Sequence, residues 1–303
     1  MTHQKTLSRQ SWADLALLSL IWGGSYLAFS LALREIGVFT TVAFRVGGGA
    51  VLLWGYIMIR RLPVPRDLRL WGAFAVMGIL NNAIPFTLIA WGQLYVPSGL
   101  ASILNASTAV FGIVIAAIVF SDERLTARKL LGVGLGFAGV SATIGLDVLR
   151  EFNLTSLAQI ALIGASISYA CAGSWGRKMM SDLPPQVSAA GMTTMATLFM
   201  VPMALYVDGR PTLNYGIATW GALIQLAVFA TAWAYLLYYR ILNTAGSGNL
   251  LLVTLMVTPI AIALGAVVLG EELNASAYVG FGFLAAGLLV IDGRILQRIR
   301  ILQ

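Results

Sequence analysis

The sequence predicts an all-α polytopic membrane protein whose ten transmembrane helices form two inverted repeats of five helices each. Of its 303 residues, 59% are hydrophobic and only 10% are charged, whereas soluble proteins average about 25% charged residues. The apolar residues gather in ten segments, each near the length of about 20 residues that a bilayer-crossing helix needs. The second half of the sequence also repeats motifs of the first. This composition excludes a soluble enzyme and an intrinsically disordered chain.

The first five predicted helices are separated by short polar connections. A basic stretch ending at Arg9 precedes the first apolar run, which resembles a secretory signal but is long and is followed by nine more runs. We therefore expect it to stay as a helix. Arg60–Pro65 closes the second segment and Ser121–Arg124 closes the fourth. The five segments are 13–33, 39–59, 70–91, 97–120 and 128–147.

Five more apolar segments follow, separated by similar short connections. Leu183–Pro185 separates the sixth from the seventh, and Asp208–Pro211 separates the seventh from the eighth. The segments are 156–176, 186–206, 215–239, 247–269 and 276–293. Since no connection is long enough to hold a soluble domain, the predicted domains are the two repeats, 1–148 and 149–303.

The distribution of basic residues predicts the orientation in the membrane. With the N-terminus in the cytoplasm, 15 of the 19 Lys and Arg residues fall inside, three fall outside, and Arg45 lies within the second segment. This positive-inside bias predicts that both termini are cytoplasmic, in the inner membrane of a bacterial cell. The net charge of +7 is scattered rather than gathered on one basic face, so no nucleic acid is expected as a partner.

The internal repeat rests on two blocks of matching residues. Phe120–Glu123 matches Leu269–Glu272 at an offset of 149, and 97–101 matches 246–250 at the same offset. The glycines at 132, 134 and 139 match those at 280, 282 and 287 at an offset of 148. Since each repeat holds an odd number of segments, the second must cross the membrane in the opposite sense. Inverted repeats are typical of secondary transporters, whose substrate site lies near mid-membrane and opens alternately to the two sides.

These motifs resemble the EamA family of the drug/metabolite transporter superfamily, and within it the bacterial YddG-type amino-acid exporters. The resemblance rests on Ile21–Ser25 in the first segment, on Ser121–Thr126, and on Pro259 with Leu269–Leu273 in the second half. The resemblance covers nearly the whole chain, and it implies that the protein exports amino acids. Val110 stands where the family pattern has a proline in the fourth helix, so this helix is expected to be straighter than its mate containing Pro259. The Trp-Gly motif is also absent from the sixth segment, which has 168–170 as Ser-Tyr-Ala.

Polar residues inside apolar segments are the first candidates for substrate binding, because each needs a partner, water or ligand in lipid. Asn81 and Asn82 precede Pro85, which frees the carbonyl of Asn81 from helix bonding. These amides either bind substrate or join neighbouring helices, and both interpretations stay open. Further candidates are Ser102 and Asn105 in the fourth segment, and Thr254 and Thr258 before Pro259 in the ninth. Repeat symmetry predicts that Asn105 faces Thr254.

Aromatic residues supply the second group of candidates. Trp22, Tyr26, Tyr169 and Tyr235 lie deep in their segments or on polar faces, Tyr235 one turn from Thr231. They predict an apolar, aromatic-lined cavity that suits a ligand with a varied side chain, although each ring taken alone is also explained by helix packing. Arg45 either snorkels to the interface or has a structural or gating role, in which it meets a substrate carboxylate at the outer gate.

The acidic residues, the single histidine and the single intramembrane arginine limit the functions that the sequence allows. All 12 acids fall in loops or near segment ends, which favours facilitated diffusion or exchange over proton coupling through a buried carboxylate. With His3 as the sole histidine, the sequence offers no metal site, no cofactor and no catalytic pair for an intramembrane enzyme. One intramembrane Arg disfavours phosphorylated substrates, and no segment resembles a channel filter. The sequence therefore predicts a monomeric exporter of amino acids and related small metabolites with broad specificity, or alternatively an exporter of drugs or other small metabolites.

Overall fold

The computed structural model describes residues 8–123, 126–144, 154–212, 214–245 and 247–292. Within these ranges the regular structure is helical and contains no strand. The first half holds α1 (Arg9–Ala32), α2 (Val38–Arg60), α3 (Leu68–Gly78), η1 (Ile79–Ala83), α4 (Ile84–Gly92), α5 (Ser98–Ala106), α6 (Thr108–Val119) and α7 (Ala127–Ile144). The second half holds α9 (Leu154–Met179), α10 (Pro185–Val207), α11 (Ile217–Ile224), η2 (Gln225–Trp233), α12 (Ala234–Ala245), α13 (Ser247–Leu264), η3 (Gly265–Leu269) and α14 (Ala275–Asp292).

Local sequence signals set several helix ends. Ser8 caps α1 by accepting the N–H of Ser11 at 3.1 Å, and Asp67 caps α3 by accepting the N–H of Arg69 at 2.9 Å. Such side chains satisfy amide groups that the first turn of a helix leaves free. Arg61 ends α2 in the left-handed conformation, with φ of 50°. The helices are thus bounded by residues that lie outside the apolar runs.

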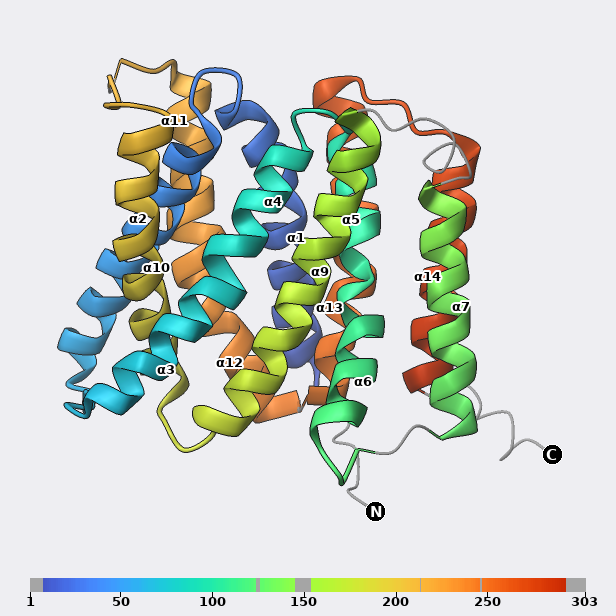
Figure 1. The fold of residues 1–303 in the computed structure, drawn as a ribbon, viewed down its shortest axis with the longest axis horizontal. Helices are drawn as coiled ribbons and strands as arrows, with labels where there is room; N and C mark the ends of the chain where they lie inside the picture. The colour runs from blue at the N-terminus through green and yellow to red at the C-terminus, as the bar shows by residue number, and fades with distance from the viewer. Residues whose placement is uncertain (1–7, 124–125, 145–153, 213, 246, 293–303) are drawn as a thin grey trace.

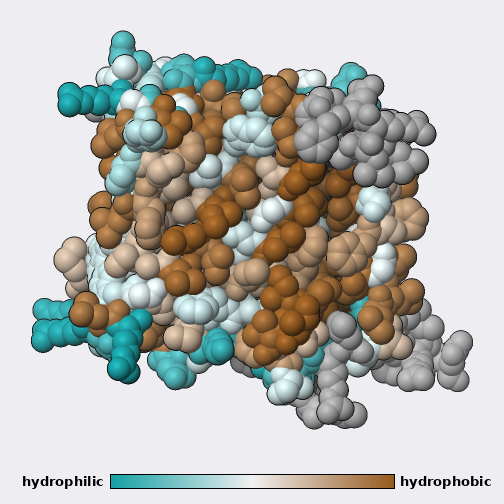
Figure 2. Space-filling view, viewed as in Figure 1, coloured by the Kyte–Doolittle hydropathy of each residue, from teal (hydrophilic) through white to brown (hydrophobic). Residues whose placement is uncertain are grey.

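The outer surface of the bundle is apolar between two polar rims (Figure 2). Large apolar side chains point outward from the helices, such as Val51 at 72%, Ile118 at 78% and Val267 at 84% exposure. An apolar surface of this extent promotes aggregation in water, and it is the surface expected of a protein embedded in lipid. Among the described residues, seven helices are long and apolar enough to cross a membrane, and two shorter apolar helices accompany them, Val253–Leu269 and Ala275–Ile291. The ten crossings and the cytoplasmic termini stay predictions.

Two long helical rods, α3–η1–α4 and α11–η2–α12, each contain a stretch of π-helix near their middle. In the first rod, Pro85 cannot donate a backbone N–H, and the wider turns of η1 accommodate this missing bond just before it. In the second rod, Thr231 donates its hydroxyl to the carbonyl of Leu226, five residues earlier, at 2.8 Å. Both π-helical stretches release backbone carbonyls for other partners, as sites for ligands often do.

The fourth helix of the first half is interrupted, which contradicts the expectation that it is straighter than its mate. α5 ends before Ser107 and α6 begins after it, although Val110 is no helix breaker. The hydroxyl of Ser107 donates to the carbonyl of Leu104 at 2.6 Å, and that of Thr108 donates to the carbonyl of Asn105 at 2.7 Å. Such back-bonding competes with the helical ladder. α13, by contrast, continues through Pro259 as one α-helix.

The helices pack around a central group formed by α1, α4, α5, α9 and α13 (Figure 1). α2 and α10 lie on one side of this group, and α7 packs along α14 on the other (Figure 1). The turns after α1, α4, α10 and η3 lie along the upper face of Figure 1, and those after α2, α6 and α9 lie along the lower face. The upper face corresponds to the predicted outside.

Glycines bring α7 and α14 into direct backbone contact. A Cβ atom at Gly139 would lie 2.7 Å from the carbonyl oxygen of Gly280, and one at Gly280 would lie 2.6 Å from that of Gly139. The same reciprocal arrangement joins Gly132 to Gly287, at 2.7 and 2.6 Å. Because only glycine permits such an approach, the glycine pattern noted in the sequence serves helix packing at this seam.

Candidate functional site

A hydrogen-bonded chain of three side chains joins the two halves at the middle of the bundle. Asn81 Nδ2 donates to the hydroxyl of Tyr235 at 3.0 Å, and that hydroxyl donates to Asn82 Oδ1 at 2.9 Å. Asn82 is fully buried, and its Nδ2 has no hydrogen-bond partner. Both asparagines lie in η1, so the π-helical turns present them to α12 of the second half. The sequence predicted these residues; what it did not predict is the unused donor.

Arg45 of α2 lies beside this chain and is 5% exposed. Its Nε donates to the hydroxyl of Thr231 at 3.3 Å, and its Cζ lies 3.6 Å from the ring centroid of Phe86 and 5.2 Å from that of Phe29. The expectation that Arg45 snorkels to the interface is therefore wrong. The faces of two aromatic rings attract the guanidinium inward, and such cation–π contacts strengthen when water is removed.

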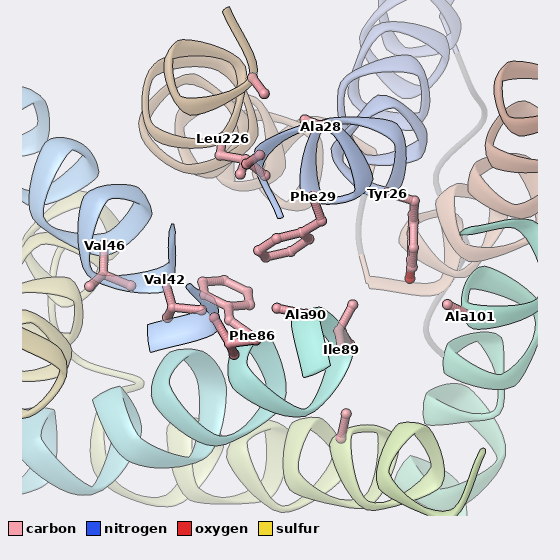
Figure 3. Packing of buried hydrophobic residues seen from close by; sticks show 14 of the residues in the cluster. Tyr26, Ala28, Phe29, Val42, Val46, Phe86, Ile89, Ala90, Ala101 and Leu226 are labelled. Atoms are coloured by element: carbon pink, nitrogen blue, oxygen red, sulfur yellow. The ribbon is translucent and has the colours of Figure 1, made fainter. Parts of the chain in front are cut away.

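Three tyrosines face the guanidinium from three helices. Tyr26 of α1, Tyr169 of α9 and Tyr235 of α12 lie close enough to Arg45 to interact with it electrostatically. Tyr26 also contacts the side chain of Asn105 in α5, whose Oδ1 is buried without a hydrogen-bond partner. Figure 3 shows the rings of Phe29 and Phe86 close to one another, and Tyr26 between Phe29 and Ala101 in this view.

We call this group the central polar cluster. It contains the predicted residues Tyr26, Arg45, Asn81, Asn82, Asn105, Tyr169, Thr231 and Tyr235, together with Phe29 and Phe86. Phe29 and Phe86 were not predicted, because nothing distinguishes them from other apolar residues of their segments. Phe29 follows Tyr26 by three residues and Phe86 follows Pro85, and these are the available signals.

Two further predicted residues, Ser102 and Thr258, bond to main-chain oxygens. Ser102 donates its hydroxyl to the carbonyl of Gly99 at 2.7 Å, and Thr258 donates to the carbonyl of Ser102 at 3.4 Å. α5 and α13 are thus joined by Thr258 and Ser102, whereas repeat symmetry had paired Asn105 with Thr254, which is half-buried.

Trp22 is likewise engaged with the protein itself. Its Nε1 donates to the carbonyl of Ala230 in η2 at 3.2 Å, and its ring lies 5.9 Å from that of Tyr238. Two serines of α9 that were not predicted also bind main-chain oxygens: Ser168 donates to Leu80 of η1 at 2.7 Å, and Ser166 donates to Leu104 of α5 at 3.2 Å. These bonds hold the interrupted helices in place around the cluster.

Carboxylates join the two halves at the upper face. Glu271 accepts the N–H and the hydroxyl of Ser98 at 2.8 and 2.7 Å, and the N–H of Gly99 at 3.2 Å, all at the N-terminus of α5. Glu35 accepts the N–H of Gly216 at 2.8 Å, before α11. Asp208 accepts the N–H of Thr40 at 2.7 Å, in the first turn of α2. Carboxylates at helix N-termini are favoured by the helix dipole.

At the lower face the halves are joined by ion pairs, of which those of Arg177 are exposed and that of Arg240 uses the buried carboxylate of Asp14. Arg177 pairs with Asp122 at 2.5 Å and with Glu123 at 3.3 Å, and Arg240 pairs with Asp14. A cavity of about 250 Å³ between α6 and α9 is lined by Tyr169 at one end and Arg177 at the other. The central polar cluster therefore adjoins a space that leads toward the lower face.

A larger cavity of about 430 Å³ lies between α2, α10 and α11. Its lining is apolar and includes Phe44, Gly48 and Trp220, and it contains none of the predicted site residues. The described residues hold no cluster of His, Cys, Asp or Glu that is suited to a metal ion. The chemistry on offer is therefore binding by one cation, amides, hydroxyls and aromatic rings.

Two stretches of the chain, residues 11–145 and 156–292, match the EamA-like transporter family. A probable amino-acid metabolite efflux pump of Escherichia coli K12 is 24% identical over 292 residues, which cover 94% of this chain and 95% of the relative. A probable terminal-alkyne amino-acid exporter of Streptantibioticus cattleyicolor is 27% identical, with 97% of each chain covered. A protein of known crystal structure is similar with a TM-score of 0.65 and 16% identity over 93% of this chain and 97% of its own, which shows a shared fold.

Proposed function

The chain belongs to the EamA-like transporter family, and from this premise we propose that it exports amino acids and related small metabolites by alternating access. Membership makes it a multi-pass membrane transporter of the drug/metabolite type. The finer assignment takes its substrate class from relatives that are named as a probable amino-acid metabolite efflux pump and a probable amino-acid exporter. The membrane we propose is the bacterial inner membrane.

One observation carries the proposal: a buried cluster of polar side chains is shared between the two halves at the point where their helices are irregular. Asn82 of the first half and Tyr235 of the second are bonded directly to each other. The buried Asn82 Nδ2 and Asn105 Oδ1 have no hydrogen-bond partner among the residues that the structure describes. Buried polar atoms without partners are costly, and a polar substrate supplies the missing hydrogen bonds. The surrounding rings accommodate varied side chains, which supports broad specificity.

Alternating access requires that contacts between the halves form at one face while those at the other face open. The two kinds of closing contact differ in this protein. Carboxylates bound to backbone N–H groups join the halves at the upper face, and exposed ion pairs such as Arg177 with Asp122 join them at the lower face. We propose that the contacts of Arg177 break first, because exposed ion pairs contribute only about 0–1 kcal/mol.

Transport into proteoliposomes tests the proposal. Purified protein is reconstituted and assayed with labelled Thr, Met, Trp, Lys and Glu, with protein-free vesicles as the blank. We expect uptake of several of them and its loss in Asn82→Leu. Asn274→Leu is the matched control, because Asn274 is an exposed asparagine in the turn before α14. A flat response to all five amino acids contradicts amino-acid export and favours a drug or other metabolite exporter.

Energy coupling and topology are tested separately. We propose facilitated diffusion or exchange, because the described acids bind groups at the faces of the bundle, as Glu271 does at α5. Uptake that depends absolutely on an imposed pH gradient contradicts this. For topology, we propose two inverted repeats, 1–148 and 149–303, with both termini in the cytoplasm. A reporter active only in the periplasm, fused after Gln303, should give no signal.

A further inference from the structure

Arg45 carries a buried charge that no carboxylate of the described residues neutralises. The ion pairs within these residues use Lys129, Arg177 and Arg240. Arg45 instead contacts the hydroxyl of Thr231 and the faces of Phe86 and Phe29. A guanidinium has five N–H donors, and its Nε alone is engaged by Thr231. Its charge and its terminal nitrogens are therefore available to an anion.

A second, independent observation lies beside it. The hydrogen-bond chain from Asn81 through Tyr235 has one direction, because the Tyr235 hydroxyl accepts from Asn81 Nδ2 and must use its single proton on Asn82 Oδ1. This direction leaves Asn82 Nδ2, which is fully buried, as a donor without a partner. With this direction of the chain, Asn82 supplies a neutral donor in the same cluster as the cation.

The third unpaired atom has the opposite character. Asn105 Oδ1 is a buried acceptor without a partner. Tyr26 contacts Asn105 and also interacts electrostatically with Arg45, so one tyrosine connects the acceptor with the cation. A cation, a donor and an acceptor within one cluster complement a molecule that carries an anion and an ammonium on neighbouring atoms.

We propose that Arg45 and Asn82 bind the α-carboxylate of the substrate and that Asn105 Oδ1 accepts a hydrogen bond from its α-ammonium. This inference rests on the proposed function and makes it more specific. The substrate class is compounds with a free α-carboxylate and a free α-amino group, with little demand on the side chain. Decarboxylated amines, amino-acid amides and N-acylated amino acids are excluded.

Four probes with one side chain separate these demands: L-methionine, L-methioninamide, 3-(methylthio)propylamine and N-acetyl-L-methionine. Their affinities for the purified protein in detergent are measured by calorimetry. For the wild-type protein we expect methionine to bind at least roughly tenfold more tightly than each of the others, since each of them lacks a charged group whose hydrogen bonds are the strong ones. In Arg45→Gln the ratio of methionine to methioninamide should fall to about one. In Asn105→Leu the discrimination against N-acetylmethionine should be lost, while that against methioninamide is retained.

Controls separate this inference from the proposed function. Arg34→Gln removes an exposed arginine of the turn after α1 and should leave all four affinities unchanged. If the wild-type protein binds no amino acid, the proposed function is wrong. If it binds methionine and Arg45→Gln keeps the wild-type ratio, the carboxylate assignment is overturned.

Conservative variants keep the test decisive if Arg45→Gln does not fold. Arg45→Lys retains the charge but loses the planar fork that matches a carboxylate, and Asn82→Asp replaces the neutral donor with an anion beside Arg45. Both should weaken methionine binding by roughly tenfold or more while the protein remains monodisperse in gel filtration. Wild-type affinity and selectivity in either folded variant overturn the inference.

Discussion

The contact between Glu271 and the N-terminus of α5 yields the most quantitative prediction. Its carboxylate accepts three hydrogen bonds, from two groups of Ser98 and from the N–H of Gly99, at 2.8, 2.7 and 3.2 Å. A hydrogen bond to a charged group contributes about 1.5–3 kcal/mol, but these three share one half-buried carboxylate that water reaches. We therefore expect Glu271→Ala to lower the free energy of unfolding by about 2–4 kcal/mol, and Glu271→Gln by about half as much, because an amide oxygen still accepts.

Unfolding in detergent micelles, followed by circular dichroism, measures this loss. Glu272→Ala is the matched control, because Glu272 is the neighbouring exposed acid in the same turn, and it should change the free energy by about 0.5 kcal/mol or less. In a Cys171→Ser background, a cysteine at the half-buried position of Leu100 should also react faster with maleimide in Glu271→Gln, since α5 is released. Equal losses in Glu271→Ala and Glu272→Ala would refute the reasoning.

Three further predictions concern the interior, the glycine seam and the lower face. Tyr235→Phe leaves the buried Asn82 Oδ1 unpaired and Asn81 Nδ2 with only the sulfur of Met192, and should lower the free energy of unfolding by about 1–3 kcal/mol. Tyr238→Phe, whose ring packs on aromatic neighbours, should have little effect; equal effects would contradict the hydrogen-bond chain. Gly280→Ala should destabilise by about 1–3 kcal/mol through overpacking, and Gly134→Ala, where a Cβ meets open space, should not; calorimetric midpoints of the two variants compare them. Arg177→Gln should cost less than about 1 kcal/mol, and the loss should shrink further at 1 M salt; a large, salt-independent loss measured in the same unfolding assay would show that these ion pairs are not screened.

The sequence predicts the long helices well because lipid imposes a simple rule on them. The first segment is predicted at 13–33 and observed at Arg9–Ala32, and the second is predicted at 39–59 and observed at Val38–Arg60. The irregular turns are harder to predict. Pro85 signals η1 through its missing N–H, but η2 contains no proline and depends on Thr231, which bonds to Leu226 and receives Arg45 from another helix. No local sequence pattern indicates such contacts between distant segments.

Some residues of the candidate site could likewise be predicted from the local sequence, and others could not. Asn81, Asn82 and Asn105 could be found because an amide in an apolar segment is conspicuous. Arg45 was also singled out, but the sequence left snorkelling and a structural or gating role open, since its partners come from α1, α4 and η2. Phe86 could not be singled out either, because its role depends on the cation that lies over it.

The reciprocal glycine contacts between α7 and α14 have a mechanical consequence. Because Gly139 meets the backbone of Gly280, and Gly132 that of Gly287, sliding or rolling of either helix drives main chain into main chain. α7 and α14 should therefore move together as one rigid body. The interruption between α5 and α6 at Ser107, whose hydroxyl donates to a main-chain carbonyl, can instead act as a hinge. Spin labels on the outward surfaces of α7 and α14 would keep a constant separation through the transport cycle. This pair is therefore a fixed reference for measuring the motion of the other helices.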